Sequence, residues 1–229
     1  MRATGQAPEV AAVRRGRFQL SANPRLLYEP VPGLAYEVGG PTRFFEWRGR
    51  SNRMGFRDRE RAPAKPPGTY RVVVLGDSIA AGYRVERAEE VFPALLERSL
   101  AGGPPDRPAV EVLNFAVTGY NTAQEVELLR ARALPFSPDL VLLAWCHNDR
   151  RPPDPRILAA LRDAEGGRRL LAPAAADQAL TWSALYRLAR WGLRRAPQEG
   201  IEESDPGEGS WRGVEGALAE LAALARRHD

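Results

Sequence analysis

Three short apolar runs, each followed by turn-forming residues, mark the middle of the chain. They are Tyr70–Gly76 (YRVVVLG), Val110–Ala116 (VEVLNFA) and Pro138–Trp145 (PDLVLLAW). Continuous apolar runs of this length are typical of strands that are buried on both faces of a parallel sheet. We therefore predict three buried β-strands in this order.

Helical patterns lie between these runs. Residues 92–100 carry apolar side chains at helical spacing, with Pro93 in the first turn, where proline is tolerated. Thr122 and Glu125 have the spacing of a capping box and predict a helix that opens there. Strands that alternate with helices imply parallel crossovers, so we predict an α/β fold with three layers, α/β/α.

The flanking segments are less regular. We expect residues 1–20 to be a disordered tail and residues 23–67 to be an irregular, turn-rich N-terminal extension with a hairpin. Residues 70–229 would form the main domain, interrupted by an insertion rich in proline and alanine at 150–177.

Two further helices are predicted near the C-terminus, separated by an acidic connector at 197–209. The Trp182–Trp191 helix has an apolar stripe and several arginines, which suits packing on the domain or lying on a membrane surface, and we favour packing. The last helix carries an apolar stripe from Trp211 to Leu224. The third strand would remain an open apolar edge, so we expect a C-terminal portion of the sheet to be missing from this sequence.

Composition excludes several classes of protein. The chain has 229 residues, 44% of them hydrophobic, which is enough to fill a core. Its net charge of +4 comes from scattered arginines, with Lys65 as the only lysine, so we expect no nucleic-acid partner. Cys146 is the only cysteine, which excludes an internal disulfide framework.

The sequence shows neither a membrane-spanning run nor the apolar core of a signal peptide. As written, we expect a cytoplasmic protein, or an exported one if the true start lies upstream. We expect no cofactor and no metal.

Each predicted strand ends in an unusual loop: GDS at 76–78, VTGYN at 117–121 and CHND at 146–149. The carboxyl ends of parallel strands share one edge of a sheet, which is where ligands bind in such folds. Each loop on its own has a simple structural explanation: a helix cap for the first, a glycine turn for the second and ordinary turn residues for the third.

Taken together, the loops resemble the blocks of the SGNH/GDSL hydrolases, which are serine esterases and lipases with a flavodoxin-like parallel sheet. "LGDS" resembles the first block, with Ser78 as nucleophile. "NFAVTGYNT" resembles the second, with Gly119, and "PDLVLLAWCHND" the third, with Asn148. The upstream stretch "SNRMGFRDRERAPAKPPGTYRVVVLGDS" is similar to the lead-in of one bacterial branch.

The resemblance implies an oxyanion hole built from the N–H groups of Ser78 and Gly119 and the side-chain amide of Asn148. Glycine suits its position because a backbone without Cβ can come close to the substrate. Asp77 is interpreted as shaping the loop and is left out of the catalytic set.

Two features depart from the family pattern. Cys146 replaces the usual glycine of the third block, which a negative φ would tolerate, and we interpret it as a buried thiol rather than a nucleophile. The family takes its base from an Asp-x-x-His motif, and neither histidine fits it: His228 has Ala225 where the aspartate should be, and His147 fills the variable position of the third block. His147 is interpreted as a loop or substrate-side residue. Residues 1–229 should therefore be nearly inactive on their own.

Three hypotheses follow. The leading one is a hydrolase of esters, with a small lipid-like ester or an O-acylated carbohydrate as substrate. The alternative is a binding module with the same fold and no catalytic base. A flavin- or phosphate-binding protein is weaker, because the chain lacks a glycine-rich phosphate loop and Asn148 would have no role.

Overall fold

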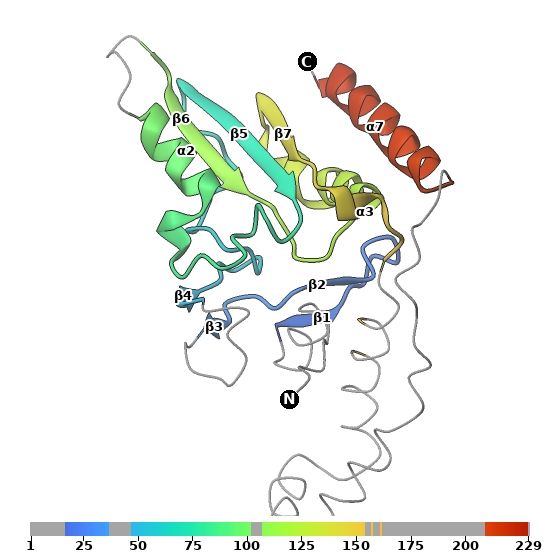
Figure 1. The fold of residues 1–229 in the computed structure, drawn as a ribbon. Coiled ribbons are helices and arrows are strands. Elements are labelled where there is room, and N and C mark those ends of the chain that lie inside the picture. Colours follow the sequence, from blue (N-terminus) through green and yellow to red (C-terminus); the bar gives the residue numbers. More distant parts are fainter. Residues whose placement is uncertain are drawn as a thin grey trace, which may run out of the picture.

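The computed structural model describes residues 17–36, 47–101, 107–153, 157, 161 and 209–228. A parallel sheet of three strands lies at its centre (Figure 1). The strands are β5 (Thr69–Gly76), β6 (Ala109–Asn114) and β7 (Leu140–Ala144), in the order β6-β5-β7. All three predicted strands are present, and β6 ends before the predicted Ala116.

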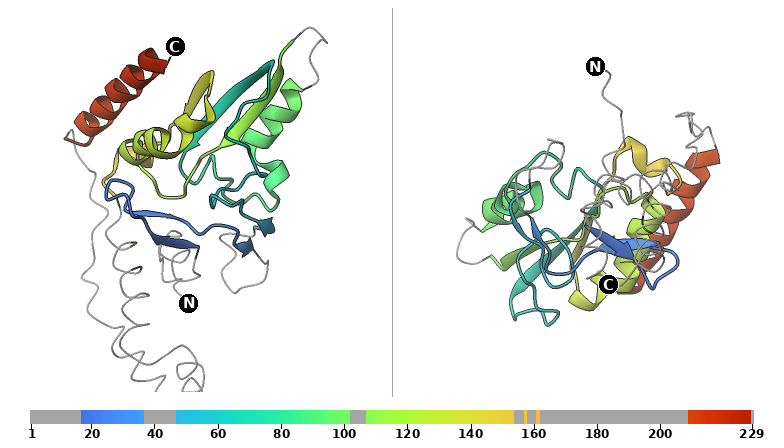
Figure 2. Two further views of the ribbon diagram at one scale, coloured as in Figure 1. Left: turned by 180° about the vertical axis from the view of Figure 1, so that it is seen from behind. Right: turned by 90° about the horizontal axis from the view of Figure 1, so that it is seen from below.

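Helices cover both faces of this sheet, as the two views in Figure 2 show. One layer is α2 (Phe92–Leu100), which packs against β6. The other contains α3 (Thr122–Leu128) and α7 (Gly209–His228), which pack against each other. The predicted three-layer α/β/α architecture is therefore confirmed, and the strand order matches the start of a flavodoxin-like sheet.

The central strand β5 supplies both halves of the core. Its alternating side chains point to opposite faces, as the period of a strand requires. Val72 and Val74 join the cluster that includes Phe92 and Leu96 of α2. On the other face, Val73 and Leu75 belong to the larger cluster on the side of α3 and α7, and both are fully buried.

Strand β7 forms one edge of the sheet in the described part of the chain, because its ladder joins it to β5 alone. Leu140, at its start, is 46% exposed. Helix α7 has the apolar stripe expected of the last helix, with Val214 and Leu224 buried, while Leu218 is exposed.

The predicted cap of α3 is wrong by one residue. Asn121 caps the helix: its side chain accepts the Gln124 N–H at 3.0 Å, and the Gln124 side chain accepts the Asn121 N–H at 3.2 Å. Thr122 instead donates its hydroxyl to the carbonyl of Asp149. Glu125 therefore takes no part in the cap, and its side chain is fully buried.

The expectation of a disordered N-terminal tail is wrong for its last residues. Strand β1 (Phe18–Leu20) pairs antiparallel with β2 (Tyr28–Pro30). A second short pair joins β3 (Ala35–Tyr36) to β4 (Gly49–Arg50). In Figure 1 these pairs lie beyond the carboxyl ends of the central strands, where the candidate loops are.

Arg57 holds the N-terminal extension against the loop that follows β5. The guanidinium of this buried side chain donates to four backbone carbonyls of residues 81–86, at 2.7 to 3.3 Å. It lies over the ring of Trp47, whose indole N–H donates to the Gly82 carbonyl at 3.0 Å. The extension is therefore part of the packing of this loop.

Several predicted segments lie outside the described residues: the tail up to residue 16, most of the 150–177 insertion, the Trp182–Trp191 helix and most of the acidic connector. Among the helices that are described, none has the length and apolarity needed to cross a membrane.

Candidate active site

The loop after β5 begins at a glycine that has no room for a side chain. A Cβ built on Gly76 would lie 2.7 Å from the Cβ of Ala80 and 3.2 Å from the carbonyl oxygen of Ala144. The first neighbour belongs to the loop and the second to β7. The glycine therefore lets the loop fold back tightly against the sheet edge.

Gly76→Ala is expected to destabilise the protein by about 1–3 kcal/mol, the usual range for overpacking. The matched control is Gly213→Ala on α7, where an added Cβ meets nothing within 4 Å. That change should be neutral or stabilising, since alanine is the better helix former. Urea unfolding of both variants measures the difference, and equal stabilities would contradict the steric argument.

Ser78 does not cap a helix. In the described segment 47–101, residues 78–84 form successive turns, and the next helical residues are Ala88–Glu90. The buried Asp77 accepts the Ile79 N–H on Oδ1 at 2.9 Å, and the Tyr83 N–H donates to the Ser78 carbonyl. The strand therefore enters a tight turn that leaves Ser78 half-buried.

The third loop reaches Ser78 through Asp77. A single 3₁₀ turn, His147–Arg150, follows β7 and is capped by the Asp149 carboxylate, which accepts the Cys146 N–H. The Asn148 side chain donates its Nδ2 to Asp77 Oδ2 at 2.8 Å, and the Ser78 hydroxyl donates to the same oxygen at 3.3 Å. The predicted nucleophile and the predicted amide donor thus meet at one atom.

The second loop lies at the same edge of the sheet. The Val117 N–H donates to the Gly76 carbonyl at 2.9 Å, which joins the two loops at their bases. Gly119 follows with a φ of 82°, in the left-handed region that favours glycine. Among the described hydrogen bonds, none links Gly119 to Ser78 or Asn148.

Asn114, at the end of β6, also ties two loops together. Its side-chain amide donates to the carbonyls of Arg57 and Ala80, each at 3.3 Å. Its side-chain oxygen accepts the Ala116 N–H at 3.1 Å. This buried asparagine was not singled out as a candidate site residue, although its place at a strand end is a readable signal.

Three carboxyl groups are buried close to the site, and each comes from a different loop or helix. They are Asp77, Glu125 and Asp149. Burial raises the pKa of Glu125 to about 9, and the charges of Asp149 and Asp77 act in the same direction. Burial also raises the pKa of Asp149 to about 7, opposed by the Cys146 N–H.

Glu125 differs from its two neighbours because neither of its oxygens has a hydrogen-bond partner among the described residues. A buried carboxyl without donors is most stable in its neutral form. The capping-box spacing predicted a cap role for Glu125, and its burial was not expected. No group of described His, Cys, Asp and Glu side chains has the arrangement of a metal site.

The two histidines are not joined to Ser78 by any hydrogen bond that the structure describes. His147 is exposed, and its Nε2 lies 3.0 Å from a guanidinium nitrogen of Arg150. His228 is the last residue of α7. Cys146 has a φ of −127°, a conformation open to any residue, so its side chain fits where the family pattern has glycine.

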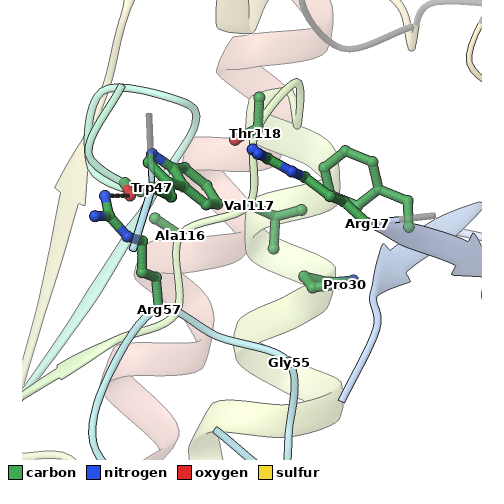
Figure 3. Close-up of a pocket in the computed structure, with 10 residues that line it drawn as sticks. Arg17, Pro30, Trp47, Gly55, Arg57, Ala116, Val117 and Thr118 are labelled. Carbon is green, nitrogen blue, oxygen red and sulfur yellow. Dashed lines mark hydrogen bonds between the residues drawn. The ribbon is translucent and has the colours of Figure 1, made fainter. Parts of the chain in front are cut away.

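A small cavity of about 20 Å³ lies beside the site, between the N-terminal extension and the first two loops (Figure 3). It has room for about one water molecule. Arg17, Trp47 and Arg57 line it on the extension side, and Val117 and Thr118 on the loop side. Ser78, Gly119 and Asn148 are not among its lining residues, so the cavity is separate from the predicted site residues.

Several solved structures and one protein family are similar to this chain. Solved structures similar to this chain include TesA, at 20% identity over 67% of this chain and 99% of that one, with a TM-score of 0.31. AlinE4, an SGNH-hydrolase family esterase, has 20% identity over 69% of this chain and 96% of its own, also at 0.31. No curated protein matches.

The family comparison covers most of the chain. The model of the GDSL-like lipase/acylhydrolase family matches residues 74–228. This range begins inside β5, just before Ser78, and includes Gly119 and Asn148. The chain belongs to the GDSL-like lipase/acylhydrolase family.

Proposed function

We propose that this chain carries the nucleophile and the oxyanion hole of a serine hydrolase that cleaves ester bonds. Ser78 Oγ would attack the acyl carbonyl, and the alcohol would leave from an acyl-enzyme that water then hydrolyses. The N–H groups of Ser78 and Gly119 and the amide of Asn148 would donate to the oxyanion. The observation that carries the proposal is the meeting of Ser78 and Asn148 at Asp77 Oδ2.

These 229 residues contain no Asp-x-x-His motif that could supply the general base. Loss of the base costs a serine hydrolase on the order of a millionfold in kcat. We therefore expect residues 1–229 to hydrolyse esters very slowly unless a base is supplied. The substrate class that we propose is a small ester, either lipid-like or an O-acylated carbohydrate.

A second candidate function is a binding module that uses the same crevice without catalysis. It is favoured by the positions of the two histidines, since His147 is paired with Arg150 and His228 ends α7. The two candidates differ in whether Ser78 can be made to react.

Imidazole added to the solution can replace the missing base and separate these candidates. With a fluorophosphonate probe, we expect residues 1–229 to be labelled slowly, and faster as imidazole is raised, with the label at Ser78 by peptide mass spectrometry. Ser78→Ala should abolish labelling, and it also corrects for direct reaction of imidazole with the probe.

The other outcomes are equally informative. Labelling that persists in Ser78→Ala would overturn the proposed nucleophile. Absence of labelling at every imidazole concentration would favour the binding module. Rapid labelling without imidazole would show that residues 1–229 contain a base after all.

A further inference from the structure

The Asp77 carboxylate receives three hydrogen bonds, two of which come from proposed catalytic groups. Oδ1 accepts the Ile79 N–H at 2.9 Å, which fixes the turn. Oδ2 accepts the Asn148 amide at 2.8 Å and the Ser78 hydroxyl at 3.3 Å. Asp77 is 1% exposed, so water does not compete for these bonds.

We propose that Asp77 is a positioning residue that orients the Asn148 carboxamide and the Ser78 hydroxyl relative to each other; the inference rests on the proposed function. A carboxylate accepts hydrogen bonds and donates none. It therefore attracts the NH₂ edge of Asn148 and repels its oxygen. The second amide N–H is then left to donate to an oxyanion.

The longer of the two bonds to Oδ2, from the Ser78 hydroxyl, holds the serine oxygen beside Asp77.

Another negative charge beside a developing oxyanion would oppose catalysis. The neighbouring Glu125 avoids this because its raised pKa, about 9, keeps it neutral at pH 7. Glu125 therefore adds no full negative charge next to Asp77. The Asp77 carboxylate alone selects the orientation of the Asn148 amide.

A double-mutant cycle tests the inference with imidazole-supported ester hydrolysis. Asp77→Asn keeps the size of the side chain and loses the accept-only character. We expect a kcat loss on the order of 10- to 100-fold with little change in KM, as for a catalytic group displaced by about 1 Å. In an Asn148→Ala background the same change should cost clearly less, because only the contact between Asp77 and Ser78 remains to be lost.

Additive losses in the cycle, or an Asp77→Asn variant as active as the wild type, would overturn the inference. These results differ from failure of the proposed function, in which Ser78→Ala would keep its activity. A measurement on the wild-type protein covers the case in which Asp77→Asn does not fold. By NMR, one proton of the Asn148 carboxamide should exchange with water more slowly than the other, and equal, fast exchange would contradict the bond to Asp77.

Discussion

Asn148→Ala is expected to lower the imidazole-supported kcat by on the order of 100- to 1000-fold, with KM little changed. The amide of Asn148 is held beside Ser78 by its bond to Asp77, so in the proposed oxyanion hole its loss would remove a preorganised donor. Such a donor contributes more as charge develops on the carbonyl oxygen than when the neutral substrate binds. The loss should therefore appear in kcat.

Asn23→Ala is the matched control, because it removes the same side chain from a site in the N-terminal extension. The Asn23 amide donates to Glu127 at 2.7 Å, and none of its described hydrogen bonds reaches the three loops. This variant should keep the wild-type kcat and KM in the same steady-state assay. An Asn148→Ala variant that is folded and retains wild-type kcat would rule out the oxyanion role.

Glu125→Gln is expected to change how the stability of the protein depends on pH. Burial raises the pKa of Glu125 from 4.5 to about 9, so the folded state binds a proton that the unfolded state releases over this range. Wild-type stability should therefore be highest below pH 4.5 as far as Glu125 is concerned, and fall as the pH rises towards 9. The loss is on the order of a few kcal/mol.

Glutamine resembles the neutral carboxyl and cannot ionise, so Glu125→Gln should lack most of this decline and exceed the wild type in stability at pH 8. Urea unfolding between pH 5 and pH 9 measures the effect. Glu89→Gln, at an exposed position in the Ala88–Glu90 turn, is the matched control and should follow the wild type. An unchanged pH dependence in Glu125→Gln would show that Glu125 is not neutral in the folded protein.

The strands and the three loops could be predicted because their signals are local. An apolar run such as 70–76 can bury the side chains of both its faces only between two layers of the fold. Parallel strands place their carboxyl ends at one edge of the sheet. These two facts are enough to predict from the sequence that Ser78 and Asn148 lie in the same region. They did not reveal that Asp77 would be the atom-level link between them.

The cap of α3 shows where local reasoning becomes ambiguous. Asn121 with Gln124 and Thr122 with Glu125 both have the spacing of a capping box, and the sequence does not rank them. Tertiary packing decides, because Thr122 is needed by the Asp149 carbonyl. The burial of Glu125 follows from that one-residue shift, so it could not be predicted until the neighbouring loop was in place.

The role of the N-terminal extension was equally hidden from sequence patterns. Its many turn formers predicted short, irregular pieces, but turn residues carry no information about what those pieces contact. The hydroxyl of Tyr28, for example, donates to the Thr118 carbonyl at 3.1 Å, a contact across 90 positions of the chain. Such contacts depend on the fold as a whole.

The hydrogen bonds from Arg57 to residues 81–86 indicate that the folded domain begins upstream of the family match. The family match starts at residue 74, downstream of the guanidinium that satisfies four carbonyls of the loop after Ser78. A version trimmed to the family boundary would lack the donor for these carbonyls and would also lose residues 69–73 of the central strand β5. Anyone who shortens, transplants or recombines this domain should keep the upstream segment attached.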